Sequence, residues 1–128
     1  VIGRAVLDGR VHTYAYDWRL YFENTLLHQA VIYRRQVFAD FRYAPNYTVS
    51  SDYELNLHLY LHGARAHRVN NIFCEYATTG VSSRVRWHSY REEIAIRRRQ
   101  IATPLLPELL APYTALRFVG RKVWKKLK

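Results

Sequence analysis

Apolar residues in the first 41 positions come in short runs separated by turn residues. Two such runs flank Asp8 and Gly9 within residues 1–11, and an Asp-Gly pair at that place predicts a β-hairpin. The run over residues 26–33 is apolar and rich in residues that favour strands, so a short strand is expected there. Residues 34–41 predict one or two helical turns.

The next segment gives two conflicting signals. Residues 55–62 alternate between apolar and polar, which by period alone predicts a strand. Ser51 and Glu54 instead have the spacing of a helix capping box, and Gly63 stands where a helix C-cap belongs. The residues of this segment are also not the β-branched types that strands favour. We therefore predict a helix over residues 52–62.

The second half of the chain predicts more strands and two further helices. Residues 65–78 have the pattern of two short strands around an Asn-Asn turn. Ser89 and Glu92 have the spacing of a second capping box, which predicts a helix that ends near Ile101. Prolines then interrupt the chain, and apolar residues recur at helical spacing from Tyr113 onward. The prolines are Pro104, Pro107 and Pro112, and the apolar residues are Leu116, Val119, Val123 and Leu127.

Of the 128 residues 49% are hydrophobic and 11 are Tyr, so we expect one globular domain with an aromatic interior or cleft.

Charge divides the chain into two parts. Residues 1–83 carry 8 Lys and Arg against 7 Asp and Glu, whereas residues 84–128 carry 12 against 3. We therefore expect a folded domain over residues 1–103 and a basic extension over residues 104–128, which implies an anionic partner.

Several segment types are missing from the sequence. No apolar run approaches the roughly 18 residues that cross a bilayer, and the first residues lack the pattern of a signal peptide. The lone Cys74 cannot form a disulfide within the chain. These features predict a cytoplasmic location. The sequence contains no Met, so an internal fragment or a processed product is expected.

Asp52 is the main candidate for chemistry. It lies at the start of the predicted helix, in the sequence Ser-Asp-Tyr-Glu-Leu, where the helix dipole favours an ionised carboxylate. A carboxylate at such a junction can act as a general base. The alternative is an ordinary acidic residue that only complements the dipole of the first helical turn.

Three short motifs, in this order and spacing, resemble family 2 glycosyltransferases of the GT-A fold. They are His28-Gln29 leading to a basic pair, the Ser51–Leu55 segment around Asp52, and the Gly-Val-Ser-Ser loop with Ser82, Ser83 and Arg84. The resemblance extends over roughly residues 1–101. It implies an α/β fold, the C-terminal half of a GT-A domain, with a mixed sheet, flanking helices and a basic C-terminal helix.

The same resemblance implies an inverting transfer of a sugar from a nucleotide-diphosphate donor to a saccharide or lipid-linked acceptor, in surface polysaccharide synthesis. Asp52 would be the catalytic base, and the sugar and phosphates would contact His28, Gln29, Ser82, Ser83 and Arg84. The family holds Mg²⁺ or Mn²⁺ through an Asp-x-Asp sequence, which these 128 residues lack. The chain is therefore expected to be the acceptor-side half of a longer enzyme and to be inactive alone. His88 is a further candidate near the metal.

The basic tail leaves two interpretations open. Residues 113–128 combine Trp124 and an apolar stripe with Lys and Arg, which is typical of a helix that lies in an anionic membrane surface. Such a helix would hold the protein on the inner face of a membrane. The alternative is a solvated helix that packs one face on the domain.

The sequence leaves two other classes of function open besides the transferase. One is a non-catalytic scaffold or a split half-enzyme. The other is a nucleic-acid-binding module, which the isoelectric point of about 10.0 would suit. The basic residues lie mainly in the tail rather than among the tyrosines of the domain, so no nucleic-acid partner is expected.

Overall fold

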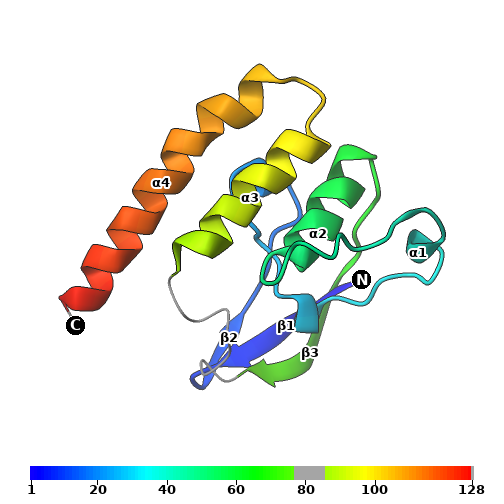
Figure 1. Ribbon diagram of the computed structural model, residues 1–128. Coiled ribbons are helices and arrows are strands. Elements are labelled where there is room, and N and C mark those ends of the chain that lie inside the picture. The colour runs from blue at the N-terminus through cyan, green and yellow to red at the C-terminus, as the bar shows by residue number, and fades with distance from the viewer. Residues whose placement is uncertain (77–85, 128) are drawn as a thin grey trace.

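The computed structural model describes residues 1–76 and 86–127 (Figure 1). The chain mixes strands and helices and ends in a basic helix, as the α/β prediction requires. The predicted binding loop with Ser82, Ser83 and Arg84 lies outside the described residues. The elements are, in order, β1 (Ile2–Leu7), β2 (Arg10–His12), η1 (Trp18–Tyr21), η2 (His28–Ala30), α1 (Val37–Asp40), α2 (Ser51–Leu61), β3 (Arg68–Tyr76), α3 (Trp87–Gln100) and α4 (Leu105–Lys126).

A small mixed sheet has the strand order β2-β1-β3, with β1 antiparallel to β2 and parallel to β3. The predicted hairpin is confirmed, because Asp8 and Gly9 have φ of 49° and 74°, the left-handed region that a tight two-residue turn uses. A Cβ atom on Gly3 would lie 2.6 Å from the Phe73 ring of β3. The close packing of Phe73 over β1 therefore depends on glycine at position 3.

The structure differs from two of the strand predictions. Residues 65–78 contain one strand, β3, in place of two strands around a turn. Asn70 and Asn71 lie within β3 at a register irregularity between the paired residues Arg68 and Ile72. The carbonyl of Asn70 accepts a hydrogen bond of 2.9 Å from Nε of Arg4, and pairing with β1 on both sides of the irregularity overrides the turn preference of the Asn pair. Within residues 26–33 the structure has the 3₁₀ helix η2 (His28–Ala30) in place of a strand, and Val31 after it makes an isolated bridge to Ile2.

Helices α2, α3 and α4 lie in a row with α3 in the middle, next to the sheet (Figure 1). The predicted helix over residues 52–62 is confirmed as α2, and Gly63 with φ of 71° follows its end. The predicted helical turn within residues 34–41 is confirmed as α1. A buried cluster joins η1, α2 and α3 and fixes the start of α2. Its residues are Leu20, Tyr53, Leu57 and Ile96.

Neither predicted capping box forms, because both glutamates make contacts with distant parts of the chain. The N-cap residues of α2 and α3 make no side-chain capping bond. Glu54 accepts a hydrogen bond of 3.3 Å from the backbone N–H of Ala44 and lies 3.3 Å from Nη1 of Arg99. Glu92 contacts the loop before α2. Both glutamates are buried, so each joins two elements rather than capping its own helix.

Of the three prolines near the C-terminus, Pro104 lies at the break between α3 and α4, as predicted, whereas Pro107 and Pro112 do not interrupt the chain. Pro104 is the N-cap of α4, Pro107 lies in its first turn and Pro112 lies in its interior. The first turn of a helix tolerates proline because its N–H groups have no partner within the helix. The C-terminal helix therefore begins at Leu105 rather than at Tyr113. No helix among the described residues is long and apolar enough to cross a membrane.

Candidate active site

A cleft of about 1030 Å³ lies at the N-terminal end of α2. The parallel strands β1 and β3 end at this cleft, with Leu7 and Tyr76 in its wall. Ligands of open α/β sheets commonly bind outside the carboxyl ends of parallel strands. The start of α3 and the C-terminal half of α4 line other parts of the cleft, with Ser89 and Arg121 respectively.

Asp52 lies in the wall of this cleft, on the first turn of α2. Its Oδ1 accepts a hydrogen bond of 2.9 Å from the backbone N–H of Tyr53, and its Oδ2 accepts one of 3.0 Å from Nδ2 of Asn24. Nδ1 of His28 lies 3.6 Å from the same Oδ2. The Asp52 side chain keeps 26% of its surface exposed, so the carboxylate is oriented by its partners and still reaches solvent.

A chain of hydrogen bonds holds Asn24 in place. Its Oδ1 accepts a hydrogen bond of 3.1 Å from Nδ2 of Asn56, which lies one turn after Asp52 on α2. Oδ1 of Asn56 accepts a hydrogen bond of 2.6 Å from the hydroxyl of Tyr33. Asn56 is fully buried. The chain of hydrogen bonds Tyr33–Asn56–Asn24–Asp52 therefore passes through the buried Asn56 to the cleft and fixes the amide that contacts the carboxylate.

Burial raises the pKa of the Asp52 carboxyl above its usual range. The nearby His28, the N–H of Tyr53 and the amide of Asn24 each oppose that rise. A carboxylate whose proton affinity is raised by burial is a better base than a solvated one. The site therefore combines an oriented carboxylate with increased basicity.

Glu92 of α3 fixes the loop that leads into Asp52. Its carboxylate accepts hydrogen bonds from the backbone N–H groups of Thr48 at 2.8 Å, Val49 at 3.0 Å and Ser50 at 2.8 Å. Desolvation alone would raise the pKa of Glu92, but these donors outweigh it and hold the pKa below its usual value. An ionised carboxylate on α3 thus sets the path of the chain into the candidate site.

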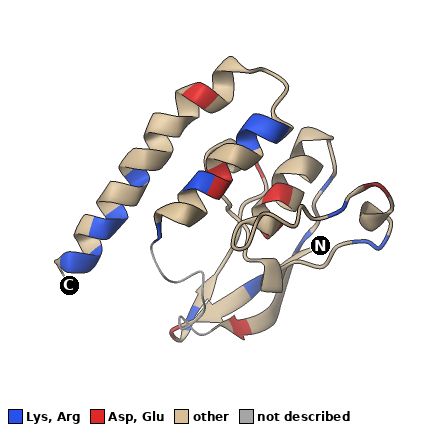
Figure 2. Cartoon of the chain, viewed as in Figure 1, with Lys and Arg blue, Asp and Glu red and all other residues tan. Residues whose placement is uncertain are grey.

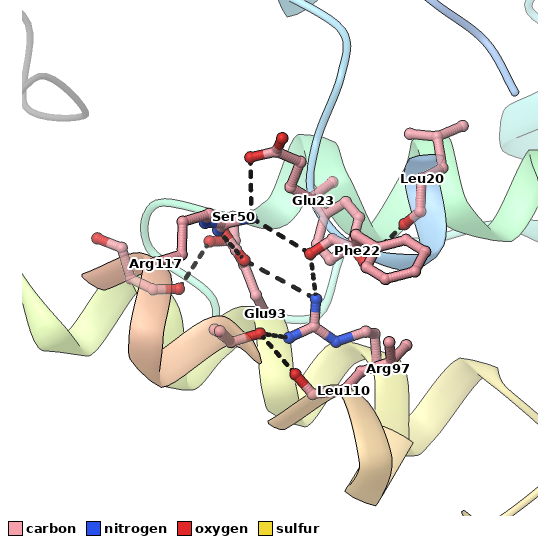
Figure 3. A network of polar contacts seen from close by, with 11 residues as sticks. Leu20, Phe22, Glu23, Ser50, Glu93, Arg97, Leu110 and Arg117 are labelled. Carbon is pink, nitrogen blue, oxygen red and sulfur yellow. Dashed lines mark hydrogen bonds and ion pairs between the residues drawn. The ribbon is translucent and has the colours of Figure 1, made fainter. Parts of the chain in front are cut away.

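Two arginines fix α4 against the rest of the cleft (Figure 3). Arg97 of α3 is fully buried and donates to the carbonyl of Phe22 at 2.6 Å and to the hydroxyl of Thr114 on α4. Arg117 of α4 donates to the same Phe22 carbonyl at 3.2 Å and forms an ion pair with Glu93 of α3. These contacts connect α3, α4 and the segment after η1.

The C-terminal half of α4 supplies a basic and aromatic wall to the cleft. Arg121, Trp124 and Lys125 line it together with Gly120. Tyr43, Tyr76 and Tyr90 line other parts of the same cleft. The cleft therefore combines a carboxylate, cationic groups and aromatic rings.

The structure brings together some of the predicted site residues. His28 lies beside Asp52 in the cleft, although on a 3₁₀ helix rather than at the start of a strand. Gln29 is exposed and is not among the residues that line the cleft. Ser82, Ser83 and Arg84 lie outside the described residues, so their positions relative to Asp52 stay predictions.

His88, the metal candidate of the sequence, contacts two residues of the protein. His88 lies 2.9 Å from Oε1 of Glu92 and 3.3 Å from the hydroxyl of Thr48. Within residues 1–76 and 86–127, no three His, Cys, Asp or Glu side chains come together as metal ligands.

Sequence reasoning missed Asn24, Asn56 and Arg121. Asn56 had one visible signal, because it is a polar residue four positions after Asp52 on a helix that is otherwise largely apolar. Asn24 and Arg121 reach the site through tertiary packing, so no local pattern indicates them.

Comparisons with known proteins add no relative to this description. No protein-family model matches the chain, and no curated protein or solved structure matches it either.

Proposed function

We propose that this chain is the acceptor-side half of an inverting GT-A glycosyltransferase, with Asp52 as its catalytic base. The main support for this proposal is the position of the Asp52 carboxylate. It is partly buried at the start of α2, in the wall of a large cleft, and hydrogen bonds from Asn24 and from the N–H of Tyr53 orient it. A general base needs this combination of fixed direction, raised proton affinity and access to substrate.

The proposed reaction is a single displacement. Asp52 takes the proton of an acceptor hydroxyl as the oxygen of that hydroxyl forms a bond to the anomeric carbon of the donor sugar. The bond from the anomeric carbon to the phosphate oxygen breaks, and the nucleoside diphosphate leaves with the electron pair. Attack from the face opposite the leaving group inverts the anomeric configuration.

The remaining cleft residues suit a saccharide. Aromatic rings in a binding site pack against the apolar faces of sugar rings, and a few polar groups fix orientation. Tyr43 and Tyr76 can supply the rings, and the Ser51 and Ser89 side chains can supply hydroxyls. His28 is placed to contact a sugar hydroxyl or to pair with the Asp52 carboxylate.

The proposal assigns the nucleotide and the divalent cation to residues outside this chain, because its sequence contains no Asp-x-Asp. The cation would neutralise charge on the leaving diphosphate. Arg121, which lines the same cleft as Asp52, is suited to contact a phosphate of a lipid-linked acceptor. The proposed setting is surface polysaccharide synthesis on the inner face of a membrane.

The proposal is tested in the natural protein that contains this chain. Transfer from nucleotide-diphosphate sugars is measured with the wild type, with Asp52→Asn and with Asp40→Asn, which alters an exposed carboxylate on α1. We expect Asp52→Asn to abolish transfer, to keep nucleotide affinity within a few-fold and to leave the circular dichroism spectrum unchanged. Asp40→Asn should retain full activity.

Turnover by Asp52→Asn at the wild-type rate would overturn the assignment of the base. A wild-type protein that transfers no sugar from any nucleotide donor, while the cleft still binds a saccharide, would favour the scaffold or split half-enzyme instead. Saccharide binding to the cleft is read from the NMR signals of Asn24 and Trp124.

A further inference from the structure

Helix α4 is apolar on two opposite faces. One face is buried against α3 through Pro107, Leu110 and Thr114. The other face carries large apolar side chains that are between 50% and 78% exposed, three to seven residues apart along the helix, so they form one continuous stripe. The residues of this outer stripe are Leu105, Leu109, Leu116, Val119, Val123 and Leu127.

The length of the outer stripe exceeds what a surface helix normally exposes. Helix α4 has 22 residues, which corresponds to about 33 Å of helix. Single exposed apolar residues are common on protein surfaces, but a contiguous apolar patch of this extent marks an interaction site. Trp124, which is 64% exposed, borders the stripe near its C-terminal end.

The charges on α4 identify the partner. Its C-terminal half carries Arg121, Lys122, Lys125 and Lys126, and no acidic residue follows Glu108 (Figure 2). Lys122 and Lys126 lie on the helix beside the outer stripe, where long side chains extend past an apolar surface to reach anionic groups. An apolar stripe bordered by cations is the pattern of a helix that lies flat in an anionic lipid surface.

A second copy of the chain is a poorer occupant of the same face. Pairing α4 with α4 in parallel would place the two basic ends side by side, and the whole chain carries a formal net charge of +10. An antiparallel pair would offer Glu108 as the acidic residue of α4 to meet the basic end. A net positive charge of this size on each copy opposes self-association.

We propose that the outer stripe of α4 docks on an anionic phospholipid surface, with the helix axis parallel to the membrane. The apolar side chains enter the boundary between head groups and acyl chains, and the flanking Lys side chains contact lipid phosphates. This docking does not depend on Asp52 acting as a base.

The test measures cosedimentation of the full protein with vesicles. One set contains phosphatidylcholine alone and the other contains phosphatidylcholine with phosphatidylglycerol. We expect the wild type to bind the anionic vesicles at least tenfold more tightly than the neutral ones, and to lose much of that preference in high salt. The double variant Leu109→Gln/Leu116→Gln should weaken binding at least tenfold.

Two further variants test whether binding is specific to α4 and how much of it depends on the lysines beside the outer stripe. The control Val11→Gln/Ile32→Gln changes exposed apolar residues on other parts of the molecule and should bind as the wild type does. The variant Lys122→Gln/Lys126→Gln should weaken binding to anionic vesicles and leave any binding to neutral vesicles unchanged.

Equal binding to both kinds of vesicle, or binding to neither, would overturn the proposal. Light scattering that shows a wild-type dimer, dissociated by Leu109→Gln/Leu116→Gln, together with no vesicle binding, would assign the stripe to a second copy. Loss of binding in the Val11→Gln/Ile32→Gln control would also contradict a site on α4.

Discussion

Asn24 donates a hydrogen bond of 3.0 Å to Oδ2 of Asp52 across 28 positions of sequence. Asn24 lies in the segment before η2, and Asp52 lies on the first turn of α2. Because the amide of Asn24 is itself held by Asn56, the carboxylate has a fixed partner on its buried side. The other contacts of Asp52 come from its neighbour Tyr53 and from the exposed His28.

Replacement of Asn24 by Ala should raise the pKa of Asp52 further, because it removes a donor to the ionised form while burial still favours the neutral form. The measurement is an NMR titration of the Asp52 carboxyl carbon. Asn46→Ala, in an exposed loop, is the control and should leave that titration unchanged. If Asp52 is the base, the acidic limb of the pH–rate profile shifts to higher pH with the titration. A lowered pKa in Asn24→Ala would contradict the geometry.

Replacement of Glu92 by Gln should lower the free energy of unfolding at pH 7 by about 3 kcal/mol, because hydrogen bonds to a buried charged acceptor contribute about 1.5–3 kcal/mol each. The pKa of Glu92 is lower in the folded state, so its stabilisation is present above the unfolded-state pKa and is lost as the pH falls through the folded-state pKa. Urea unfolding at several pH values measures this.

The difference between wild type and Glu92→Gln should therefore shrink in acid. Glu75→Gln, an exposed change on β3, should show no such difference at any pH. A difference that grows as the pH falls would contradict the assigned role of Glu92.

Replacement of Gly3 by Ala should destabilise the fold by about 1–3 kcal/mol, because the new Cβ would overlap the Phe73 ring unless that ring moves. Adding Phe73→Leu to Gly3→Ala should recover part of the loss. The matched control is Gly120→Ala on α4, where nothing lies within 4 Å of the new atom. Since alanine favours a helix over glycine, Gly120→Ala should instead stabilise by about 0.5–1 kcal/mol. Chemical denaturation of the four proteins checks both signs.

Replacement of Arg97 by Met should lower the free energy of unfolding by about 3–5 kcal/mol, because it removes one cation from a buried ion-pair network and leaves Glu93 with Arg117 as its cationic partner. The Phe22 carbonyl and the Thr114 hydroxyl each lose one hydrogen bond in the same variant. The next residue, Arg98, pairs with Glu108 at the surface. Arg98→Met should therefore leave the denaturation midpoint unchanged, and equal losses in the two variants would contradict a structural role for the buried network.

Local signals in the sequence predicted the elements that depend on neighbouring residues. The hairpin was predictable because Asp8 and Gly9 alone supply its turn conformation. Helix α2 was predictable from its residue types and from Gly63 at its end, although Glu54 does not form the expected capping bond. The candidate base at its first turn was predictable for the same reason, since the start of a helix is a local feature.

Elements set by distant contacts could not be predicted. β3 extends through an Asn pair because β1, from the start of the chain, pairs with it on both sides of that pair. α4 continues through Pro112 because its packing on α3 offsets the cost of proline in a helix interior. The amide chain behind Asp52 joins Asn24, Tyr33 and Asn56 from separate segments, and no spacing rule connects them.

The parallel pairing of β1 with β3 constrains how this chain folds as it leaves the ribosome. The β1–β2 hairpin can close early because its strands are adjacent, but an isolated two-stranded hairpin is marginally stable at best. The second partner of β1 is Arg68–Tyr76, so the sheet is complete only after that segment has been synthesised. Until then the apolar side of β1 is open to other chains. We expect ribosome-bound chains that end before Arg68 to recruit chaperones, and chains that extend past Tyr76 to release them.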